Sequence, residues 1–511
     1  MSKHVIYCIR SGLRPLFSDS LINCCRLWSK PSFSSYTCHR VSSRRQEVST
    51  NDVNKEVDKV LIDANYQELV PPNWQTIGDK QKVLLIMPRQ KWGHKEMDIN
   101  YAKNLMNETI ALVNTLPNMK VIDSVMISTL DLRSKRMFGS GNLELLKKRV
   151  MANPNITAVV FSIEMLKAIQ MSEMESQLGV NIYDRYSIVL NIFKSQANTK
   201  EAKLQIALAE IPYIRKNLRA LENTRNTRDK SWLKVTGGMG QTLFEVRKKI
   251  LIEREIKLKK LLDKIESNRK ILRQNRERKQ YPVIAIIGYT NSGKTSLIKA
   301  LTHDEKLTPK NQLFATLDVT VHEGRLPSSV KVLFTDTIGF ISDIPTALIH
   351  SFKATLSEIC FADIIVHVLD ISHPNYKLHE QVVSQTLDEI QVPEKLKNSI
   401  IEVANKVDLV TDKNIVDNCN KLLVSATQRI GFTQLLSVIE KQVIENTKRL
   451  DKTLRVANGG PEYQWLYKEA AIRELNVDSN DYNFLILKVF ITNEMFDKFN
   501  HIFSGSFDDI K

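Results

Sequence analysis

One eight-residue segment constrains this chain more than any other. The run GYTNSGKT, Gly288–Thr295, follows the apolar, strand-like run VIAIIG and precedes the helical pattern SLIKALT. A GxxxxGK[ST] segment between a strand and a helix predicts a phosphate-binding P-loop. Its glycines let the loop wrap closely, so that backbone N–H groups and the helix N-terminus face phosphate oxygens. The predicted nucleotide contacts are Gly288, Tyr289, Thr290, Asn291, Ser292, Gly293, Lys294, Thr295 and Ser296.

Two side chains of this loop and a second segment predict a magnesium site. Lys294 can reach the β- and γ-phosphates, and the Thr295 hydroxyl can ligate Mg²⁺. The run DTIG follows the strand-like run KVLFT, which places an acid at a strand end. Its carboxylate can lie near Mg²⁺, through water, while the N–H of the glycine approaches the γ-phosphate. The nucleotide contacts predicted in this segment are Asp336, Thr337, Ile338 and Gly339.

A third and a fourth segment predict which base is bound. Asp408, in the run NKVD, can accept hydrogen bonds from guanine N1–H and the 2-amino group. Adenine offers neither donor and would leave a carboxylate unpaired, so the run favours GTP over ATP. Asn405 is expected on the N7 side of the base, with the stem of Lys406 along its face. A backbone N–H of Ser425-Ala426, after the run KLLV, is expected to bond guanine O6.

The loop after the P-loop helix supplies the remaining candidate. Thr316, in LFATLD, is expected to sense Mg²⁺ and the γ-phosphate, and Thr320 is the alternative that spacing does not exclude. The predicted Mg²⁺ site thus comprises Thr295, Thr316 and Asp336, and the predicted catalytic residues are Lys294, Thr316 and Gly339. We expect residues 281–446 to form a P-loop GTPase (G) domain around a mixed, mostly parallel sheet.

Three other regions have their own character. Residues 81–199 alternate strand-like and helical runs, which predicts an N-terminal α/β domain. In residues 200–279, Leu251, Leu258 and Ile265 recur every seven residues after a glycine-containing turn, which predicts a long antiparallel helical hairpin. Residues 454–511 contain LILKVFI and are expected to form a small C-terminal α+β domain. The fold class is therefore α/β.

The positive charge is concentrated in two places. The chain of 511 residues has a formal charge of +16. Residues 1–50 carry 8 Lys and Arg against 2 Asp and Glu, a net +6, and residues 200–279 carry 23 against 10, a net +13. The rest is therefore about −3 (16 − 6 − 13). A basic charge confined to one hairpin predicts an arm that binds a polyanion, such as RNA.

The N-terminal segment predicts an organellar address. Residues 1–48 are rich in Arg and Ser, nearly free of acid, and lack the uninterrupted apolar run of a secretory signal. We expect them to be a mitochondrial targeting segment, with a disordered basic tail as the alternative, and residues 49–80 to be a linker. Removal of the targeting segment would leave two cysteines, Cys360 and Cys419, which are too few for a disulfide framework or a Cys-based zinc site. The expected location is the mitochondrial matrix.

Several runs resemble the HflX-type GTPase family. They are GYTNSGKTSLIKALT, LFATLDVT, DTIGFISDIP and FKATLSE, with DRYSIVLNIFKSQANTKEAKLQIALAEIPY and FGSGNLELL upstream. The likeness covers roughly residues 80–445 and, with the N-terminal segment, points to the mitochondrial branch. The sequence differs from the family at the hairpin turn, where it has Gly238-Met239-Gly240-Gln241 and the family has a longer glycine-rich stretch. At Phe340 the sequence has the family's phenylalanine, whereas many other GTPases have a water-orienting glutamine at this position.

The resemblance implies a ribosome-associated GTPase that inserts its hairpin into the large ribosomal subunit and its rRNA. It further implies separation of ribosomes into subunits and support of large-subunit maturation, with hydrolysis driving release. Because Phe340 cannot orient water, we expect slow intrinsic hydrolysis that the ribosome stimulates. The alternative is an assembly checkpoint without splitting activity; a GTPase without ribosomes is a third class. We expect a monomer without a membrane span. Asn291 also suggests the hypothesis of a K⁺ site. The candidate RNA contacts are Lys234, Arg247, Lys248, Lys249, Arg254, Lys257, Lys259 and Lys260.

Overall fold

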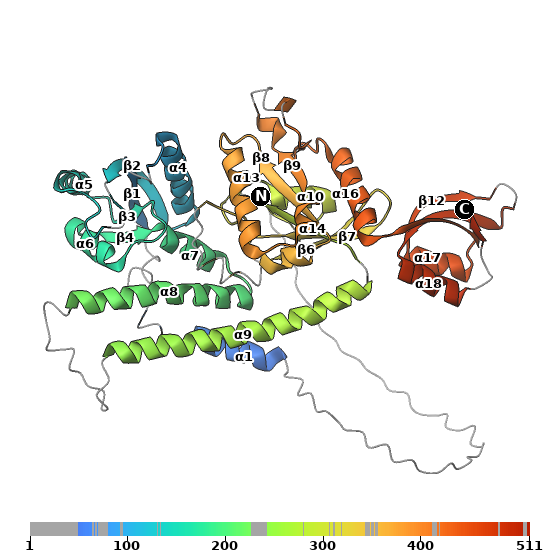
Figure 1. Ribbon diagram of the computed structural model, residues 1–511, viewed down its shortest axis with the longest axis horizontal. Coiled ribbons are helices and arrows are strands. Elements are labelled where there is room, and N and C mark those ends of the chain that lie inside the picture. Colours follow the sequence, from blue (N-terminus) through green and yellow to red (C-terminus); the bar gives the residue numbers. More distant parts are fainter. Residues whose placement is uncertain are drawn as a thin grey trace, which may run out of the picture. The chain divides into compact units, whose positions relative to one another are not determined.

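The fold comprises three sheets and a pair of long helices (Figure 1). The computed structural model describes residues 50–63, 66, 69, 80–91, 96–129, 131–132, 134–225, 243–279, 281–305, 307–309, 312–317, 319–342, 348, 352, 356–410, 416–417, 419–478, 481–503 and 508–510. The predicted targeting segment 1–48, the glycines of the hairpin turn and Lys234 lie outside these residues. Among the described helices, none is long and apolar enough to cross a membrane.

The first sheet is parallel and has the strand order β2-β1-β3-β4. Its strands are β1 (Gln81–Gln90), β2 (Met119–Thr129), β3 (Ala158–Phe161) and β4 (Asn181–Asp184). The helices between and after them are α4 (Ile99–Thr115), α5 (Ser140–Ala152), α6 (Ala168–Leu178) and α7 (Arg185–Gln196).

Alternation along β1 places helices on both faces of this sheet. Val83 and Leu85 belong to the hydrophobic cluster that includes α4 and α7, whereas Leu84 and Ile86 belong to the cluster that includes α5 and α6. Because successive side chains of a strand point to opposite faces, a continuous apolar run predicts a strand buried on both sides. The α/β prediction for this region is confirmed, although β4, α6 and α7 were not predicted as separate elements.

The hairpin consists of α8 (Lys200–Arg225) and α9 (Leu243–Lys279). Leu204 and Ile211 of α8 pack against Leu258 of α9, and all three are buried. A third helix, α1 (Thr50–Leu61), adds Val57, which is 1% exposed, to the same cluster. The predicted linker 49–80 was therefore wrong over residues 50–61, because the apolar side of α1 has a partner in the hairpin.

A buried polar network fixes the segment after α1 on the hairpin. The Tyr66 hydroxyl donates to Glu210 Oε2 at 2.5 Å, and the Arg254 guanidinium lies 3.5 Å from the centre of the Tyr66 ring. Arg254 also donates to the Val60 carbonyl at 2.7 Å and is only 4% exposed. Burial raises the pKa of Tyr66 and lowers that of Arg254, so the phenol stays neutral. The prediction that Arg254 contacts RNA is therefore wrong: its charge faces inward.

The G-domain sheet has six strands in the order β10-β9-β8-β5-β7-β6, all parallel except the pair β6–β7. The strands are β5 (Val283–Gly288), β6 (Thr320–Arg325), β7 (Lys331–Asp336), β8 (Ile364–Asp370), β9 (Ile401–Asn405) and β10 (Leu422–Leu423). The helices include α10 (Lys294–Thr302), α13 (Tyr376–Ile390), α14 (Glu394–Lys397) and α16 (Phe432–Thr447), with 3-10 turns η2 (Ser357–Phe361) and η3 (Val407–Leu409). The predicted mixed, mostly parallel sheet is confirmed.

The C-terminal sheet is antiparallel, in the order β12-β13-β11-β14. Its elements are β11 (Leu450–Ala457), α17 (Pro461–Glu469), β12 (Ala471–Val477), β13 (Phe484–Ile491), α18 (Asn493–Ile502) and β14 (Asp508–Ile510). Leu466 and Phe499 of the two helices pack against Leu454 and Leu487 of the sheet. This βαββαβ order is that of a ferredoxin-like domain. The α+β prediction is confirmed, and its first strand begins at Leu450, upstream of the predicted 454.

The buried position of Arg254 leads to a prediction about α1. We expect Arg254→Ala to leave the Val60 carbonyl without its buried donor and the Tyr66 ring without the cation above it, at a cost of about 1–3 kcal/mol. Local opening of α1 should then become about 5–150-fold more frequent. Hydrogen–deuterium exchange of peptides from residues 50–61 measures this directly. Lys257→Ala, on the exposed side of α9, is the control and should leave that exchange unchanged. Equal exchange in both variants would contradict the buried role of Arg254.

Candidate functional site

The P-loop connects β5 to α10 and encloses a buried lysine. Lys294 is 7% exposed, and its Nζ donates to the carbonyls of Gly288 at 3.2 Å and Tyr289 at 3.0 Å. Burial lowers the pKa of Lys294 to about 8, while Asp336 acts in the opposite direction. Within the described residues the ammonium is thus held by neutral carbonyls, with no carboxylate in direct hydrogen-bond contact. A phosphate group fits here, because it would supply the missing negative charge.

Close packing explains one glycine of the loop. Gly293 has φ +95°, and a Cβ there would lie 2.3 Å from Asn405 Nδ2. Both the left-handed backbone and the lack of space require glycine. A small cavity lies beside the loop, and its lining includes Thr290, Asn291, Gly293, Lys294, Thr295 and Ser296 of this region together with Thr316 and Gly339. The three predicted catalytic residues, Lys294, Thr316 and Gly339, therefore line the same cavity.

The three residues predicted at the Mg²⁺ site come together. Asp336 Oδ2 accepts hydrogen bonds from Thr295 at 2.7 Å and from Thr316 at 3.0 Å, and the two hydroxyls lie 3.1 Å apart. The other oxygen, Oδ1, is buried and has no hydrogen-bond partner among the described residues. Burial raises the pKa of Asp336, and Lys294 and the two hydroxyls counteract it. Two hydroxyls and a carboxylate are hard oxygen donors, which fit Mg²⁺.

The geometry favours Thr316 over Thr320 as the threonine that senses Mg²⁺ and the γ-phosphate, in the loop after α10 that is here called switch I. Thr320 is the first residue of β6, and its hydroxyl lies 2.9 Å from His322 Nε2. Thr316 instead contacts both other members of the predicted metal site. The sequence spacing did not decide between Thr316 and Thr320, but the hydrogen-bond partners of their hydroxyls do.

The segment that begins at Asp336 and includes Gly339, Phe340 and Ser342, here called switch II, lies directly against the P-loop. The Thr290 N–H donates to the Phe340 carbonyl at 2.7 Å, and the Phe340 N–H donates to the Gly288 carbonyl at 3.1 Å. A Cβ at Gly339 would lie 2.9 Å from Thr290 Cγ2 and 3.1 Å from Lys294 Nζ. Only a glycine lets the backbone N–H come this close to the phosphate side of the loop.

Two predicted nucleotide contacts in this segment turn their side chains away. The Thr337 hydroxyl donates to the Ile286 carbonyl at 2.7 Å, and Ile338 is buried in the hydrophobic core. Both side chains therefore brace the switch segment against the domain, and any contact of these two residues with nucleotide, which stays a prediction, would be made by their backbone. Phe340 is 1% exposed in the same core, so its ring lies where it cannot contact an attacking water.

The base-recognition segments meet through Asn405. Its Nδ2 donates to the Ser292 carbonyl at 2.9 Å, and its Oδ1 accepts the Ala426 N–H at 3.1 Å. The Ser425 N–H donates to the Ile430 carbonyl at 3.1 Å. Both amides predicted to bond guanine O6 are therefore engaged inside the loop in this arrangement. Through these two hydrogen bonds, the side chain of Asn405 joins the P-loop to the loop expected beside the base.

Asp408 has an oxygen available for a base. Its Oδ2 accepts from the Thr427 hydroxyl at 3.3 Å, whereas its Oδ1 is buried and without a partner among the described residues. Lys406 adopts φ +64° and forms an ion pair with Asp370 Oδ2 at 2.7 Å. Asp370, at the end of β8, was not predicted. Its position after a strand neighbouring β5 was the signal that could have identified it.

Three P-loop side chains have different surroundings. Tyr289 is buried, and its ring stacks on His379 with centroids 3.8 Å apart, so it points away from the phosphate side. The Ser292 hydroxyl is buried without a partner in the described part of the chain. Asn291 is exposed with φ +60°. Its proposed role in K⁺ binding stays a hypothesis.

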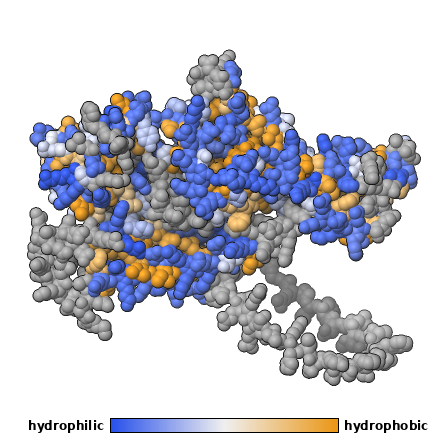
Figure 2. Space-filling view, in the orientation of Figure 1, coloured by the Kyte–Doolittle hydropathy of each residue, from blue (hydrophilic) through white to orange (hydrophobic). Residues whose placement is uncertain are grey.

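The basic surface of α9 is a second candidate site. Lys248, Lys249, Lys257, Lys259 and Lys260 are exposed, and Arg247 is half-buried. Lys259 pairs with Glu255 at 2.7 Å, and Lys249 lies 4.0 Å from Glu253. Exposed Ile252 and Ile256 lie among these cations, and Figure 2 shows hydrophilic and hydrophobic surface side by side along the two long helices.

The available oxygen of Asp408 leads to a prediction about base specificity. Asp408→Asn removes the negative charge and replaces one carboxylate oxygen by an NH₂ donor. It should weaken GTP binding about a hundredfold or more, because one hydrogen bond to the base is lost and the other is no longer charge-assisted. The same change should strengthen binding of xanthosine triphosphate, whose 2-oxo group accepts from the new amide. Competition titrations with a fluorescent guanine nucleotide measure both affinities. Unchanged GTP affinity would contradict the assignment of Asp408 to the base.

Comparisons with known proteins give family models and a solved structure to which this chain is similar. Three family models match: "GTP-binding GTPase N-terminal" over residues 103–194, "GTP-binding GTPase Middle Region" over 196–276, and "50S ribosome-binding GTPase" over 283–406. The crystal structure of SsGBP with GDP is 25% identical with a TM-score of 0.40, covering 71% of this chain and 99% of that one.

Two relatives extend the likeness across most of the chain. "Putative GTP-binding protein 6" of Xenopus laevis is 41% identical over 450 residues, which is 88% of this chain and 84% of that protein. "GTPase HflX" of Caldanaerobacter subterraneus subsp. tengcongensis is 36% identical over 312 residues, which is 61% of this chain and 70% of that protein. Together with the nucleotide site described above, these matches establish that the chain belongs to the HflX-type family of GTPases.

Proposed function

We propose that this GTPase acts in mitochondria, where it binds the large ribosomal subunit through α8 and α9. It favours separated subunits over the joined ribosome, supports maturation of the large subunit, and leaves the subunit after hydrolysis. The observation that carries the proposal is the row of exposed lysines on α9, in a chain whose G domain matches a family described as 50S ribosome-binding. The basic, acid-poor residues 1–48 support the location.

The charge and length of α9 suit binding to rRNA. At 1.5 Å per residue, its 37 residues extend over roughly 55 Å. Side chains along such a helix can reach phosphates well inside a folded RNA, largely through charge and independently of sequence. Lys248, Lys257 and Lys260 are exposed and have no carboxylate partner within the described part of the chain, so they carry the most available charge.

The energetics of splitting set a requirement for the nucleotide. A factor shifts the equilibrium towards free subunits only if it binds the free subunit more tightly than the joined ribosome. GTP, held by Lys294 and the switch residues, orders the conformation that binds the subunit in this proposal. Mg²⁺ at Thr295, Thr316 and Asp336 would neutralise charge that develops on the phosphates. Hydrolysis then removes the γ-phosphate that holds the switches, and affinity falls.

A charge-deletion experiment tests the RNA-binding surface. Replacing Lys248, Lys249, Lys257 and Lys260 by Ala should weaken binding to purified large subunits. The slope of log K against log salt should become shallower by about 0.7–0.9 per lost phosphate contact. The control removes four lysines from the N-terminal domain, Lys103, Lys120, Lys147 and Lys148, and should leave the slope unchanged. Equal slopes in the two variants would contradict the proposed surface.

A sedimentation experiment tests the function itself. Mitochondrial monosomes incubated with residues 50–511 should separate into subunits with GTP or a non-hydrolysable analogue, and stay intact with GDP. Lys294→Ala should abolish separation, because the phosphates lose their buried cation. If monosomes stay intact while the protein sediments with isolated large subunits, the assembly-checkpoint function replaces splitting. Separation by Lys294→Ala in GTP would contradict the nucleotide-dependent mechanism.

A further inference from the structure

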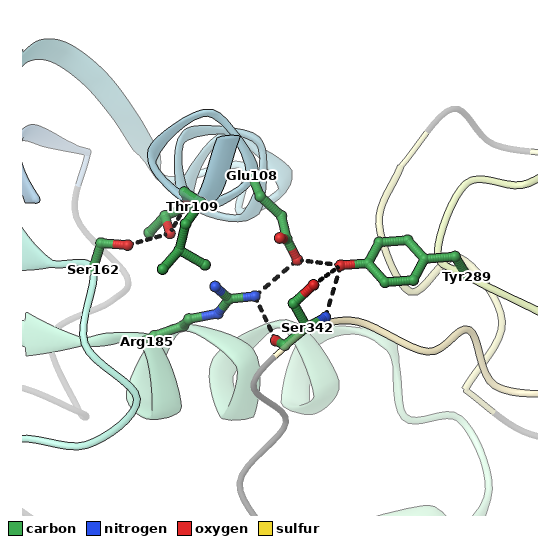
Figure 3. Close-up of polar contacts among 7 residues, drawn as sticks. Glu108, Thr109, Ser162, Arg185, Tyr289 and Ser342 are labelled. Carbon is green, nitrogen blue, oxygen red and sulfur yellow. Dashed lines mark hydrogen bonds and ion pairs between the residues drawn. The ribbon is translucent and has the colours of Figure 1, made fainter. Parts of the chain in front are cut away.

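A polar cluster joins the N-terminal domain to the P-loop and switch II (Figure 3). Glu108 of α4 and Arg185, the first residue of α7, approach Tyr289 of the P-loop and Ser342, three residues after Gly339. Arg185 Nη2 donates to Glu108 Oε1 at 2.8 Å and to the Ser342 carbonyl at 2.7 Å. The Tyr289 hydroxyl lies 2.8 Å from the same Glu108 oxygen.

Ser342 is held from both sides of this cluster. Its N–H donates to the Tyr289 hydroxyl at 2.7 Å, and its own hydroxyl lies 2.7 Å from the same oxygen. The carbonyl of Ser342 accepts from Arg185. The backbone N–H, the side chain and the carbonyl of one switch II residue therefore all bind this network.

Burial makes these contacts costly to break. Arg185 is 2% exposed and Tyr289 is 5% exposed. Arg185 Nη1 has no partner among the described residues, so Nη2 carries the hydrogen bonds of the guanidinium that the structure shows at this interface. If Ser342 moved away, a buried cation and a buried phenol would each lose a partner, which is unfavourable unless water or another group replaces it.

The contacts exist together with an ordered arrangement of both switches. Phe340, two residues before Ser342, is paired with the P-loop backbone, and Gly339 lies against Thr290 and Lys294. Thr316 of switch I contacts Asp336 and Thr295 at the same time. This is the arrangement that a γ-phosphate requires, since the Gly339 N–H and Thr316 both have to reach it.

We propose that Glu108 and Arg185 are positioning residues for switch II, through which the N-terminal domain stabilises the GTP-binding arrangement of the G domain. They act on Ser342 and Tyr289 and do not touch the nucleotide. Since Ser342 follows Gly339 by three residues, fixing Ser342 restricts the positions that the Gly339 N–H can take. The hydrogen bonds of this network to Ser342 form only while switch II occupies the position that GTP binding requires. Their free energy therefore adds to the affinity for GTP and not to the affinity for GDP.

The same helix connects the cluster to the hairpin. Tyr186, next to Arg185, donates to the Ala209 carbonyl of α8 at 2.5 Å, and its ring lies parallel to that of Tyr213 with centroids 5.5 Å apart. A displacement of α8 would therefore act on Tyr186 and, through it, on the adjacent Arg185. By thermodynamic reciprocity, if the N-terminal domain alters GTP affinity, then GTP alters the placement of this domain and its helices by the same free energy.

Nucleotide affinities of point variants test the proposal without any ribosome. In the full chain, Glu108→Gln and Tyr289→Phe each remove part of the network with little change of volume. Each should weaken binding of a non-hydrolysable GTP analogue by about fivefold or more, within the usual range of coupling energies, and change GDP affinity much less. Arg185→Ala should have the largest effect, and Arg185→Lys, which keeps the charge, should recover part of it.

A double-mutant cycle separates positioning from general damage. Glu108→Gln combined with Tyr289→Phe should weaken analogue binding less than the product of the two single effects, because both remove the same contact. Arg149→Ala is the matched control: it breaks the Arg149–Asp123 ion pair of the same domain, at 2.6 Å, away from the cluster. It should leave the ratio of the two affinities unchanged.

Hydrogen–deuterium exchange supplies the reciprocal readout. Peptides from α4 and the start of α7 should be better protected with the GTP analogue than with GDP, and Glu108→Gln should abolish that difference. An unchanged analogue-to-GDP affinity ratio in Glu108→Gln and Tyr289→Phe, with folded protein by circular dichroism, would overturn the proposal. A failure of subunit binding with these nucleotide results intact would instead count against the proposed ribosomal function alone.

Discussion

The nucleotide site depends on one buried amide. Asn405, 1% exposed, uses its NH₂ group to hold the Ser292 carbonyl and its oxygen to hold the Ala426 N–H. These partners belong to the phosphate-binding loop and to the loop beside the base, segments 113 and 21 residues from Asn405. The amide needs Gly293 beside it, since any side chain there would occupy its position. Phosphate and base binding are thus set by the same few atoms, and the spacing between them is fixed before a ligand arrives.

This convergence follows from the direction of the strands. β5, β7, β8, β9 and β10 are parallel neighbours, so their carboxyl ends lie on one edge of the sheet. The P-loop, Asp336, Asp370, Asn405 and Ser425 each lie at or just after one of those ends. Because the sheet buries both faces, the loops at this edge carry the polar chemistry while the strands carry the apolar core. The Lys406–Asp370 ion pair then ties two neighbouring loops together.

Local motifs made much of this site predictable, whereas contacts between distant segments were not predictable from one sequence. The P-loop, Asp336 and Asp408 each have a fixed chemical reason for their residue type, and the structure brings the three predicted Mg²⁺ residues together. Thr337 and Ile338 lie inside a motif whose spacing does not reveal which side chains face inward. Arg254 is instructive, because it lies three residues after Leu251 and four before Leu258, both buried. That spacing places it on the apolar seam, and its burial could have been inferred from the helical period. Arg185 lies in a run that carries the family resemblance, but nothing in that run, and no pattern around Glu108, indicates their contact, which arises only where two domains meet.

Arg185 lies between the helical hairpin and switch II. It begins a helix whose next residue, Tyr186, contacts α8, and its own guanidinium contacts switch II. A factor that holds RNA with one element and nucleotide with another needs the two affinities to depend on each other; otherwise hydrolysis would change nothing at the RNA. A flexible joint between domains would not supply that dependence. A buried cation whose acceptors lie on α4 and on switch II does, because neither side can move without leaving a charge less well satisfied. Phe193 of α7 also packs against Phe314 and Phe352 of the G domain, so the polar cluster lies at the edge of an apolar contact that holds the two domains together.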